Sequence, residues 1–257
     1  MAKGKKRKRK NWNFYMSELR PAGACSSEPC APALAKKKSF IEKLLPKHMI
    51  IPLIFLIIGN AAAYYGPRYL NVLFHRSYLD MSCAVDSTIS VFPPFAIIYV
   101  LAFPFWYLTA YLYLRKDRDH AYRYALTNVA AKVVCAVLFI TVPSTLIRPE
   151  ITGGTICHSI LKIVYATDAP NNLFPSIHCL ESWICFRCIY DDKQAPRWLK
   201  IFTFVFAILI CASTVLTKQH VLLDIPAGVF LAELTWRLSS VHPIKKCIRK
   251  ISQLIRF

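Results

Sequence analysis

The sequence predicts an all-α protein, a polytopic membrane helical bundle of about six transmembrane helices. Two observations support this fold class. Hydrophobic residues make up 55% of the 257 residues, more than ordinary soluble domains contain. Long apolar segments with few charges also recur along the chain, most of them near the length that an α-helix needs to cross the hydrocarbon core. We therefore expect an integral membrane protein.

The first 47 residues predict a basic tail. Seven of the first ten residues are Lys or Arg, and a second basic cluster lies at residues 36–38. A formal net charge of +19 raises the question of nucleic-acid binding, but basic runs beside membrane spans usually mark the cytoplasmic side. We expect a disordered cytoplasmic tail that is attracted to anionic lipid, with no nucleic-acid partner. The apolar segment that begins near Met49 is expected to act as an uncleaved anchor.

Apolar segments predict a six-helix transmembrane domain over residues 48–238. In chain order the helices are expected at residues 49–65, 90–114, 125–146, 177–190, 199–216 and 220–238. The fourth is short for a span and contains Glu181 and Arg187. Without it, the segments that carry the two histidines described below would end on opposite sides of the membrane.

Loop charge predicts the orientation. Basic residues gather around the ends of the second, fourth and sixth helices, and few lie in the alternate loops. They are Arg115, Lys116, Arg118, Arg123, Arg187, Lys193, Arg197, Lys200, Lys245, Lys246, Arg249 and Lys250. Because cytoplasmic loops carry the excess of Lys and Arg, both termini are expected in the cytoplasm, with the plasma membrane as the expected location.

Charged residues within the spans need partners. We expect a structural ion pair between Lys132 in the third helix and Glu233 in the sixth, near the inner ends of both. Glu181 lies three residues after His178 on the same helical face, where it either tunes that histidine or makes a structural hydrogen bond.

The last residues and the cysteines predict two further features. Residues 239–257 are expected to form a basic amphipathic tail at the interface. Its apolar face would contain Ile244, Cys247, Ile248, Ile251, Leu254 and Ile255. Cys185 and Cys188 form a lone Cys-x-x-Cys inside a span, so no zinc site is expected. Cys83 and Cys157 lie in the outer loops, where an oxidising compartment would permit a disulfide.

Two histidines mark the candidate site. One lies in Phe174-Pro175-Ser176-Ile177-His178, and the other, His220, is followed four residues later by Asp224. If a helix begins at His220, Asp224 falls on the same face and can orient the imidazole, which suits a nucleophile. The predicted topology places Arg148, His178 and His220 at the same outer face of the membrane.

These residues resemble the type 2 phosphatidic acid phosphatase superfamily of membrane lipid phosphatases and phosphotransferases. The resemblance covers residues 140–235. The family's second motif is present in full as Pro175-Ser176-Ile177-His178, and its third motif matches at Ser213, His220 and Asp224 with the same spacing. Two motifs in order, separated by membrane spans, are a much stronger signal than either alone.

The chain departs from the family pattern at two cations. Only Arg148-Pro149 of the first motif is present, with Thr141 where the family has Lys, and Thr214 stands where the third motif has Arg. The sequences of residues 148–153 and 217–220 resemble more closely those of the family branch that includes inositol-phosphorylceramide synthases.

The resemblance implies a phosphoryl-transfer mechanism. His220 would attack phosphorus to give a phosphohistidine, Asp224 would orient it, and His178 would protonate the leaving alkoxide. The residues expected to bind phosphate are Arg148, Ser176, Lys218 and Ser213. No metal or other cofactor is expected. The implied substrate is a lipid phosphate, and the partners are membrane lipids.

Three other functions remain open from the sequence. A phosphotransferase would pass a phospho-headgroup, for example inositol phosphate, to a lipid acceptor. A catalytically degenerate scaffold would explain the two missing cations, although it would not explain why both histidines and Asp224 are present. A membrane-tethered binder would act through its basic tail and would lose its function with that tail. No pattern indicates the oligomeric state.

Overall fold

The computed structural model describes residues 40–255, so the predicted tail lies outside the described residues up to residue 39. The helices are α1 (Phe40–Leu44), a 3-10 turn (Lys47–Met49), α2 (Ile50–Leu73), α3 (Ala84–Thr88), α4 (Phe95–Leu114), α5 (Arg118–Thr141), α6 (Ile156–Thr167), α7 (Ile177–Asp191), α8 (Arg197–Leu216), α9 (Asp224–Leu238) and α10 (His242–Leu254). The strands β1 (Leu79–Asp80) and β2 (Ser144–Thr145) form a short parallel pair.

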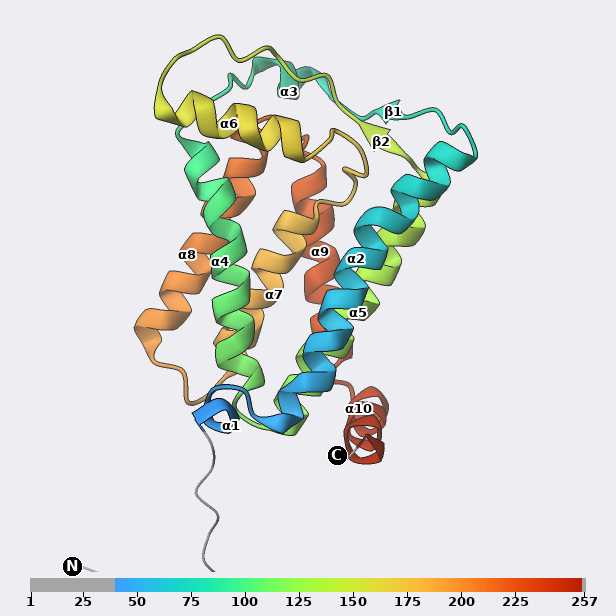
Figure 1. Cartoon of the computed structure of the whole chain (residues 1–257), viewed down its shortest axis with the longest axis vertical. Helices are drawn as coiled ribbons and strands as arrows, with labels where there is room; N and C mark the ends of the chain where they lie inside the picture. Colours follow the sequence, from blue (N-terminus) through green and yellow to red (C-terminus); the bar gives the residue numbers. More distant parts are fainter. Residues whose placement is uncertain (1–39, 256–257) are drawn as a thin grey trace, which may run out of the picture. The chain divides into compact units, whose positions relative to one another are not determined.

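The predicted all-α membrane bundle is confirmed. Within the described residues, α4, α5, α8 and the segment Lys47–Leu73 containing α2 are long and apolar enough to cross a membrane. Together with the shorter α7 and α9 they stand side by side in the bundle (Figure 1), and these six correspond to the six predicted helices.

The boundaries differ where tertiary contacts or backbone conformation decide them. α2 continues to Leu73, past the predicted end at residue 65, and its Asn71 side chain donates a buried hydrogen bond of 2.9 Å to the Phe139 carbonyl of α5. α5 ends at Thr141, before Pro143, because a proline disfavours helical conformation in the residue that precedes it. α9 begins at Asp224 rather than at residue 220.

The short helix α7 is the centre of the bundle. It packs against α4, α5, α8 and α9, and most of its side chains are buried, including Leu180, Ile184 and Cys188. A helix surrounded by other helices is not required to match the lipid thickness by itself. This explains how a segment of 15 residues with internal charges serves as the fourth helix.

The predicted ion pair between Lys132 and Glu233 is wrong. The Lys132 ammonium contacts Glu181 and lies 2.9 Å from the Asn128 side-chain oxygen, and the Asn128 amide donates to Glu181 at 2.6 Å. Glu233 instead pairs with the guanidinium groups of Arg187 and Arg237. The rotation of α7 decides this, because it turns Glu181 toward α5. Of the two roles considered for Glu181, these contacts favour the structural one.

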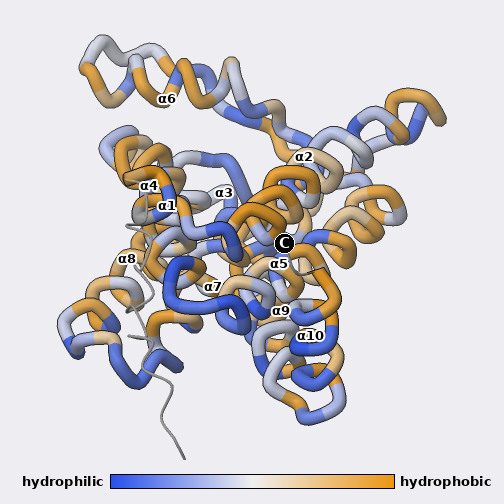
Figure 2. Tube along the Cα trace, turned by 60° about the horizontal axis from the view of Figure 1, so that its bottom comes forward, coloured by the Kyte–Doolittle hydropathy of each residue, from blue (hydrophilic) through white to orange (hydrophobic). Residues whose placement is uncertain are grey.

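The two ends of the bundle are different. The helix α6, which was not predicted, lies with α3 across the end where α4 begins, and α10 lies at the other end (Figure 1). In the view with the α10 end turned forward, the hydrophilic segments at this end are α10 and the α4–α5 and α7–α8 turns (Figure 2). Cys83 and Cys157 at the α6 end are both free thiols, so the disulfide considered from the sequence is not formed.

Candidate active site

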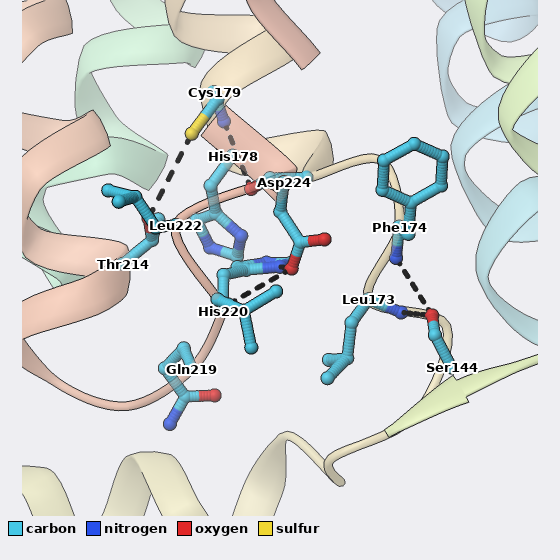
Figure 3. Close-up of polar contacts among 12 residues, drawn as sticks. Ser144, Leu173, Phe174, His178, Cys179, Thr214, Gln219, His220, Leu222 and Asp224 are labelled. Atoms are coloured by element: carbon cyan, nitrogen blue, oxygen red, sulfur yellow. Dashed lines mark hydrogen bonds and ion pairs between the residues drawn. The ribbon is translucent and has the colours of Figure 1, made fainter. Parts of the chain in front are cut away.

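Two histidines and one aspartate meet beneath α6. Asp224, the first residue of α9, is fully buried, and its carboxylate lies 2.9 Å from Nδ1 of His220 and also accepts the Val221 N–H at 3.2 Å. The rings of His220 and His178 lie 6.0 Å apart between centroids. Figure 3 shows this cluster, with the His220 ring joined to the Asp224 carboxylate. The sequence prediction that these three residues meet therefore agrees with the geometry.

The turn before α9, not a helix, positions His220. The N–H groups of Gln219 and His220 both donate to the Thr214 carbonyl, at 2.9 and 3.0 Å, and Lys218 adopts a positive φ of 51°. This reversal places His220 in the tight turn between the fifth and sixth predicted helices, as the predicted topology requires, but the helix expected from residue 220 begins only at Asp224. The turn nevertheless brings His220 onto Asp224, whose charge is favoured at a helix N-terminus.

Asp224 favours the protonated form of His220. Although burial acts to lower it, the hydrogen bond and the charge of Asp224 raise the pKa of His220 above its ordinary value. Because Nδ1 faces the carboxylate, Nε2 is the ring nitrogen that remains for chemistry.

Asp86, in the short helix α3, accepts hydrogen bonds from the same turn. Its carboxylate accepts the Leu222 N–H at 2.7 Å and the Cys83 N–H at 2.9 Å, and its backbone carbonyl accepts a hydrogen bond from the Lys218 ammonium. Burial acts to raise the pKa of Asp86, but these donors hold it below its ordinary value. Sequence reasoning missed Asp86, because the contact joins segments more than 130 residues apart.

The start of α7 is fixed by close backbone packing. The Ser176 hydroxyl caps the helix by accepting the Cys179 N–H at 3.4 Å, and the Ser176 N–H donates to the Asp224 carbonyl at 3.3 Å. The neighbouring residue on α9 is Gly228, where an added Cβ would lie 2.6 Å from the Ser176 carbonyl oxygen. Glycine is therefore required at residue 228 for α9 to approach the start of α7 closely enough for the Ser176 N–H to reach the Asp224 carbonyl.

His178 is held by aromatic rings from α4. It stacks on Tyr99 with 4.2 Å between centroids, and Trp106 and Phe103 lie at 5.0 and 5.9 Å. Its Nδ1 is 3.4 Å from the Tyr99 hydroxyl, and its Nε2 is buried without a protein partner. One ring nitrogen is therefore anchored and the other is unpaired in the interior of the protein.

Asp168 connects this histidine to three other segments. Its carboxylate accepts hydrogen bonds from Tyr99 at 2.8 Å and Tyr64 at 3.2 Å, and its backbone carbonyl accepts one from Arg148 at 2.6 Å. Because the Tyr99 hydroxyl donates to Asp168, its oxygen is the acceptor for His178 Nδ1–H. Asp168 follows α6 and belongs to no motif, so sequence reasoning did not identify it.

Arg148 is the predicted cation that reaches this cluster. Its guanidinium lies over the Tyr165 ring at 4.8 Å and donates to the Gln219 side-chain oxygen, and burial lowers its pKa. Both Nε of Arg148 and the amide nitrogen of Gln219 are buried donors without a protein acceptor.

Comparison with known proteins adds one finding. Residues 125–245 match the family model of the PAP2 superfamily. The match contains Arg148, His178, His220 and Asp224, and it supports a phosphatase- or phosphotransferase-type function. It agrees with the superfamily that the motifs resemble. No curated protein and no solved structure matches the chain.

At the two positions that depart from the PAP2 motifs, the threonine hydroxyls bind their own helices. Thr141 donates to the Val137 carbonyl at 2.9 Å, and the buried Thr214 donates to the Cys211 carbonyl at 2.7 Å. Neither hydroxyl replaces the long cation of the family pattern. Arg148 and its neighbour Gln219 are therefore the donors that accompany the histidines.

The remaining predicted site residues are engaged elsewhere. The Ser213 hydroxyl donates to the Ile210 carbonyl at 2.7 Å, and the Lys218 ammonium is turned toward Asp86. Their phosphate-binding roles stay predictions. No group of three or more His, Cys, Asp or Glu residues that could hold a metal ion occurs within residues 40–255.

Proposed function

We propose that this protein is a membrane-embedded lipid phosphate phosphatase that acts through a phosphohistidine on His220. One observation supports it above all. The buried Asp224 carboxylate holds Nδ1 of His220, which leaves Nε2 as the nucleophile, and a second imidazole with an unpaired Nε2 lies 6.0 Å away between ring centroids.

The reaction follows from these roles. Nε2 of His220 attacks phosphorus, the bond from phosphorus to the lipid oxygen breaks, and His178 gives that oxygen its proton. Water then loses a proton to His178 and attacks the phosphohistidine, which releases inorganic phosphate and restores both histidines. Tyr99 and Asp168 stabilise the protonated form of His178 through its Nδ1–H.

Phosphate binding is assigned chiefly to Arg148 and the Gln219 amide, whose unpaired buried donors suit phosphoryl oxygens. Ser176, Ser213 and Lys218 are the further candidates from the motifs. The donors of Arg148 and Gln219 would stabilise the charge that spreads over the phosphoryl group in the transition state.

The site is assigned to the extracytoplasmic face of the plasma membrane. The basic turns and α10 occupy the end of the bundle opposite the histidines, and the excess of Lys and Arg marks the cytoplasmic side. Residues 48–238 then form the catalytic membrane domain, and the flanking basic segments 1–47 and 239–257 lie in the cytoplasm.

A phosphotransferase is the second candidate, because threonines replace two cations of the PAP2 pattern and the motif text resembles the inositol-phosphorylceramide synthase branch. In that case a lipid or sugar hydroxyl would take the place of water as acceptor. Purified protein in detergent should be given a panel of radiolabelled phospholipids and polyprenyl phosphates, with and without inositol or other alcohols. Release of inorganic phosphate alone supports hydrolysis, and label in the alcohol supports transfer.

The roles of the two histidines can be distinguished with substrates whose leaving groups differ in their need for a proton. His220→Ala should be inactive on every phosphate ester. His178→Gln should lose most activity on a lipid phosphate but keep a much larger fraction on p-nitrophenyl phosphate, because nitrophenolate leaves without a proton. Equal losses on both substrates would refute the general-acid role, and an active His220→Ala protein would refute the proposed function.

A further inference from the structure

The helix α10 is fixed to the bundle rather than trailing from it. Its Ile248 and Ser252 are buried where it packs on α5. Arg118 donates to the Ser252 carbonyl, and Arg249 pairs with Asp119 at 3.2 Å. These contacts hold the helix in one orientation at the end of the bundle opposite the histidines (Figure 1).

One side of α10 is apolar and uncovered. Leu254 is 74% exposed and Ile244 is 38% exposed, and Cys247 between them is also exposed. Apolar side chains that stay exposed next to membrane-spanning helices are suited to the boundary between headgroups and acyl chains. This side therefore places the helix at headgroup depth.

The other side of α10 forms a basic concavity. A hollow of about 650 Å³ is lined by His242, Lys245, Lys246, Arg249, Lys250 and Gln253. No carboxylate lines it. A second hollow of about 420 Å³ lies between α10 and the α4–α5 turn, and it shares Lys245 and Arg249 with the first.

The lysines of this concavity are not neutralised by the protein. Within residues 40–255, neither Lys245, Lys246 nor Lys250 forms an ion pair, whereas other basic residues at this end do, such as Lys116 with Asp192. Three lysines without an ion-pair partner therefore line one hollow, and Asp117 and Asp119 line only the neighbouring hollow that Lys245 and Arg249 also border.

We propose that the basic concavity of α10 binds the phosphate groups of anionic phospholipid headgroups. The ligand is a lipid rather than a nucleic acid, because the uncovered apolar side keeps these cations at the membrane surface. Each Lys or Arg near an anionic surface adds to the attraction, so the loss of two of them should weaken binding. This anion site lies at the opposite end of the bundle from His220 and is independent of turnover.

The test measures binding rather than activity. Full-length protein carrying His220→Ala, so that the probe is not consumed, is titrated in zwitterionic detergent with short-chain phosphatidylinositol bisphosphate. The double variant Lys246→Gln/Lys250→Gln should weaken binding about tenfold or more. The matched control Lys193→Gln/Arg197→Gln removes equal charge from exposed residues at the same end and should change binding less than about twofold.

Two further arms decide the nature of the ligand. Short-chain phosphatidylcholine should not bind, and the soluble inositol phosphate headgroup should compete with the lipid more effectively than a single-stranded oligonucleotide does. Equal weakening by both double variants would refute the proposal, because the attraction would then be a diffuse effect of net charge. Displacement by the oligonucleotide at lower concentration than the headgroup would refute the lipid assignment.

Discussion

Replacing Asp224 with asparagine tests the centre of the proposed mechanism. The substitution keeps the shape of the side chain and an acceptor for the Val221 N–H, but it removes the buried charge that lies 2.9 Å from Nδ1 of His220. A hydrogen bond to a charged partner contributes ~1.5–3 kcal/mol, which corresponds to a loss of roughly 10- to 150-fold in kcat.

The pH profile carries the sharper prediction. A nucleophilic His220 must lose its proton, so the acidic limb of kcat/KM follows its pKa, which the wild-type protein holds above the ordinary value. Without the charge of Asp224, burial remains and lowers that pKa. The acidic limb of Asp224→Asn should therefore move to lower pH, and the activity loss should shrink as the pH falls.

Asp86→Asn is the matched control. It also neutralises a buried carboxylate that holds the same turn, but Asp86 contacts the backbone at Leu222 and not the imidazole. Measured on p-nitrophenyl phosphate across pH, Asp86→Asn should lower kcat without moving the acidic limb. An unmoved limb in Asp224→Asn, or an equal movement in Asp86→Asn, would show that Asp224 does not act through His220.

Three other expectations concern packing, metal and orientation. Gly228→Ala should destabilise the protein by ~1–3 kcal/mol in thermal unfolding and lower activity, because its Cβ would lie 2.6 Å from a backbone carbonyl of α7. Gly66→Ala, with nothing within 4 Å of the added Cβ, should unfold at the wild-type temperature or above, and the reverse order would contradict this packing argument. Chelators should leave activity intact, and a loss that a divalent ion restores would overturn the metal-free mechanism. In sealed cells with Cys157→Ser, an impermeant thiol reagent should label the exposed Cys83 and not the exposed Cys247, and the opposite result would reverse the orientation.

Local sequence patterns predicted the membrane helices and the contact between His220 and Asp224. Apolar segment length predicted the helices, since it reflects the lipid thickness and needs no knowledge of the packing partners. The spacing from His220 to Asp224 predicted their contact, although the chain reaches it through a turn rather than a helix. The fourth helix was expected to begin directly after Ser176, and in the structure the Ser176 hydroxyl caps α7 there.

Contacts between distant segments could not be predicted in this way. The partner of Lys132 depends on the rotation of α7 about its axis. This rotation directs Glu181 toward Lys132 of α5, and Glu233 forms an ion pair with Arg187 instead. A single sequence fixes which residues share a face of one helix, but not which face meets a neighbour.

The site divides along the same line. The sequence proposed His178, His220, Asp224 and Arg148 as site residues, because phosphoryl-transfer chemistry requires particular residue types at short, regular spacing, and their catalytic roles stay predictions. Other parts of the site were decided by tertiary structure alone. These are the hydrogen bonds of Asp86 to the turn and the hydrogen bonds that join Asp168 through Tyr99 to His178. The contact of the Lys218 ammonium with Asp86 is a third. Each joins side chains that are distant in the chain, and only the packing of the helices brings such groups within hydrogen-bond distance.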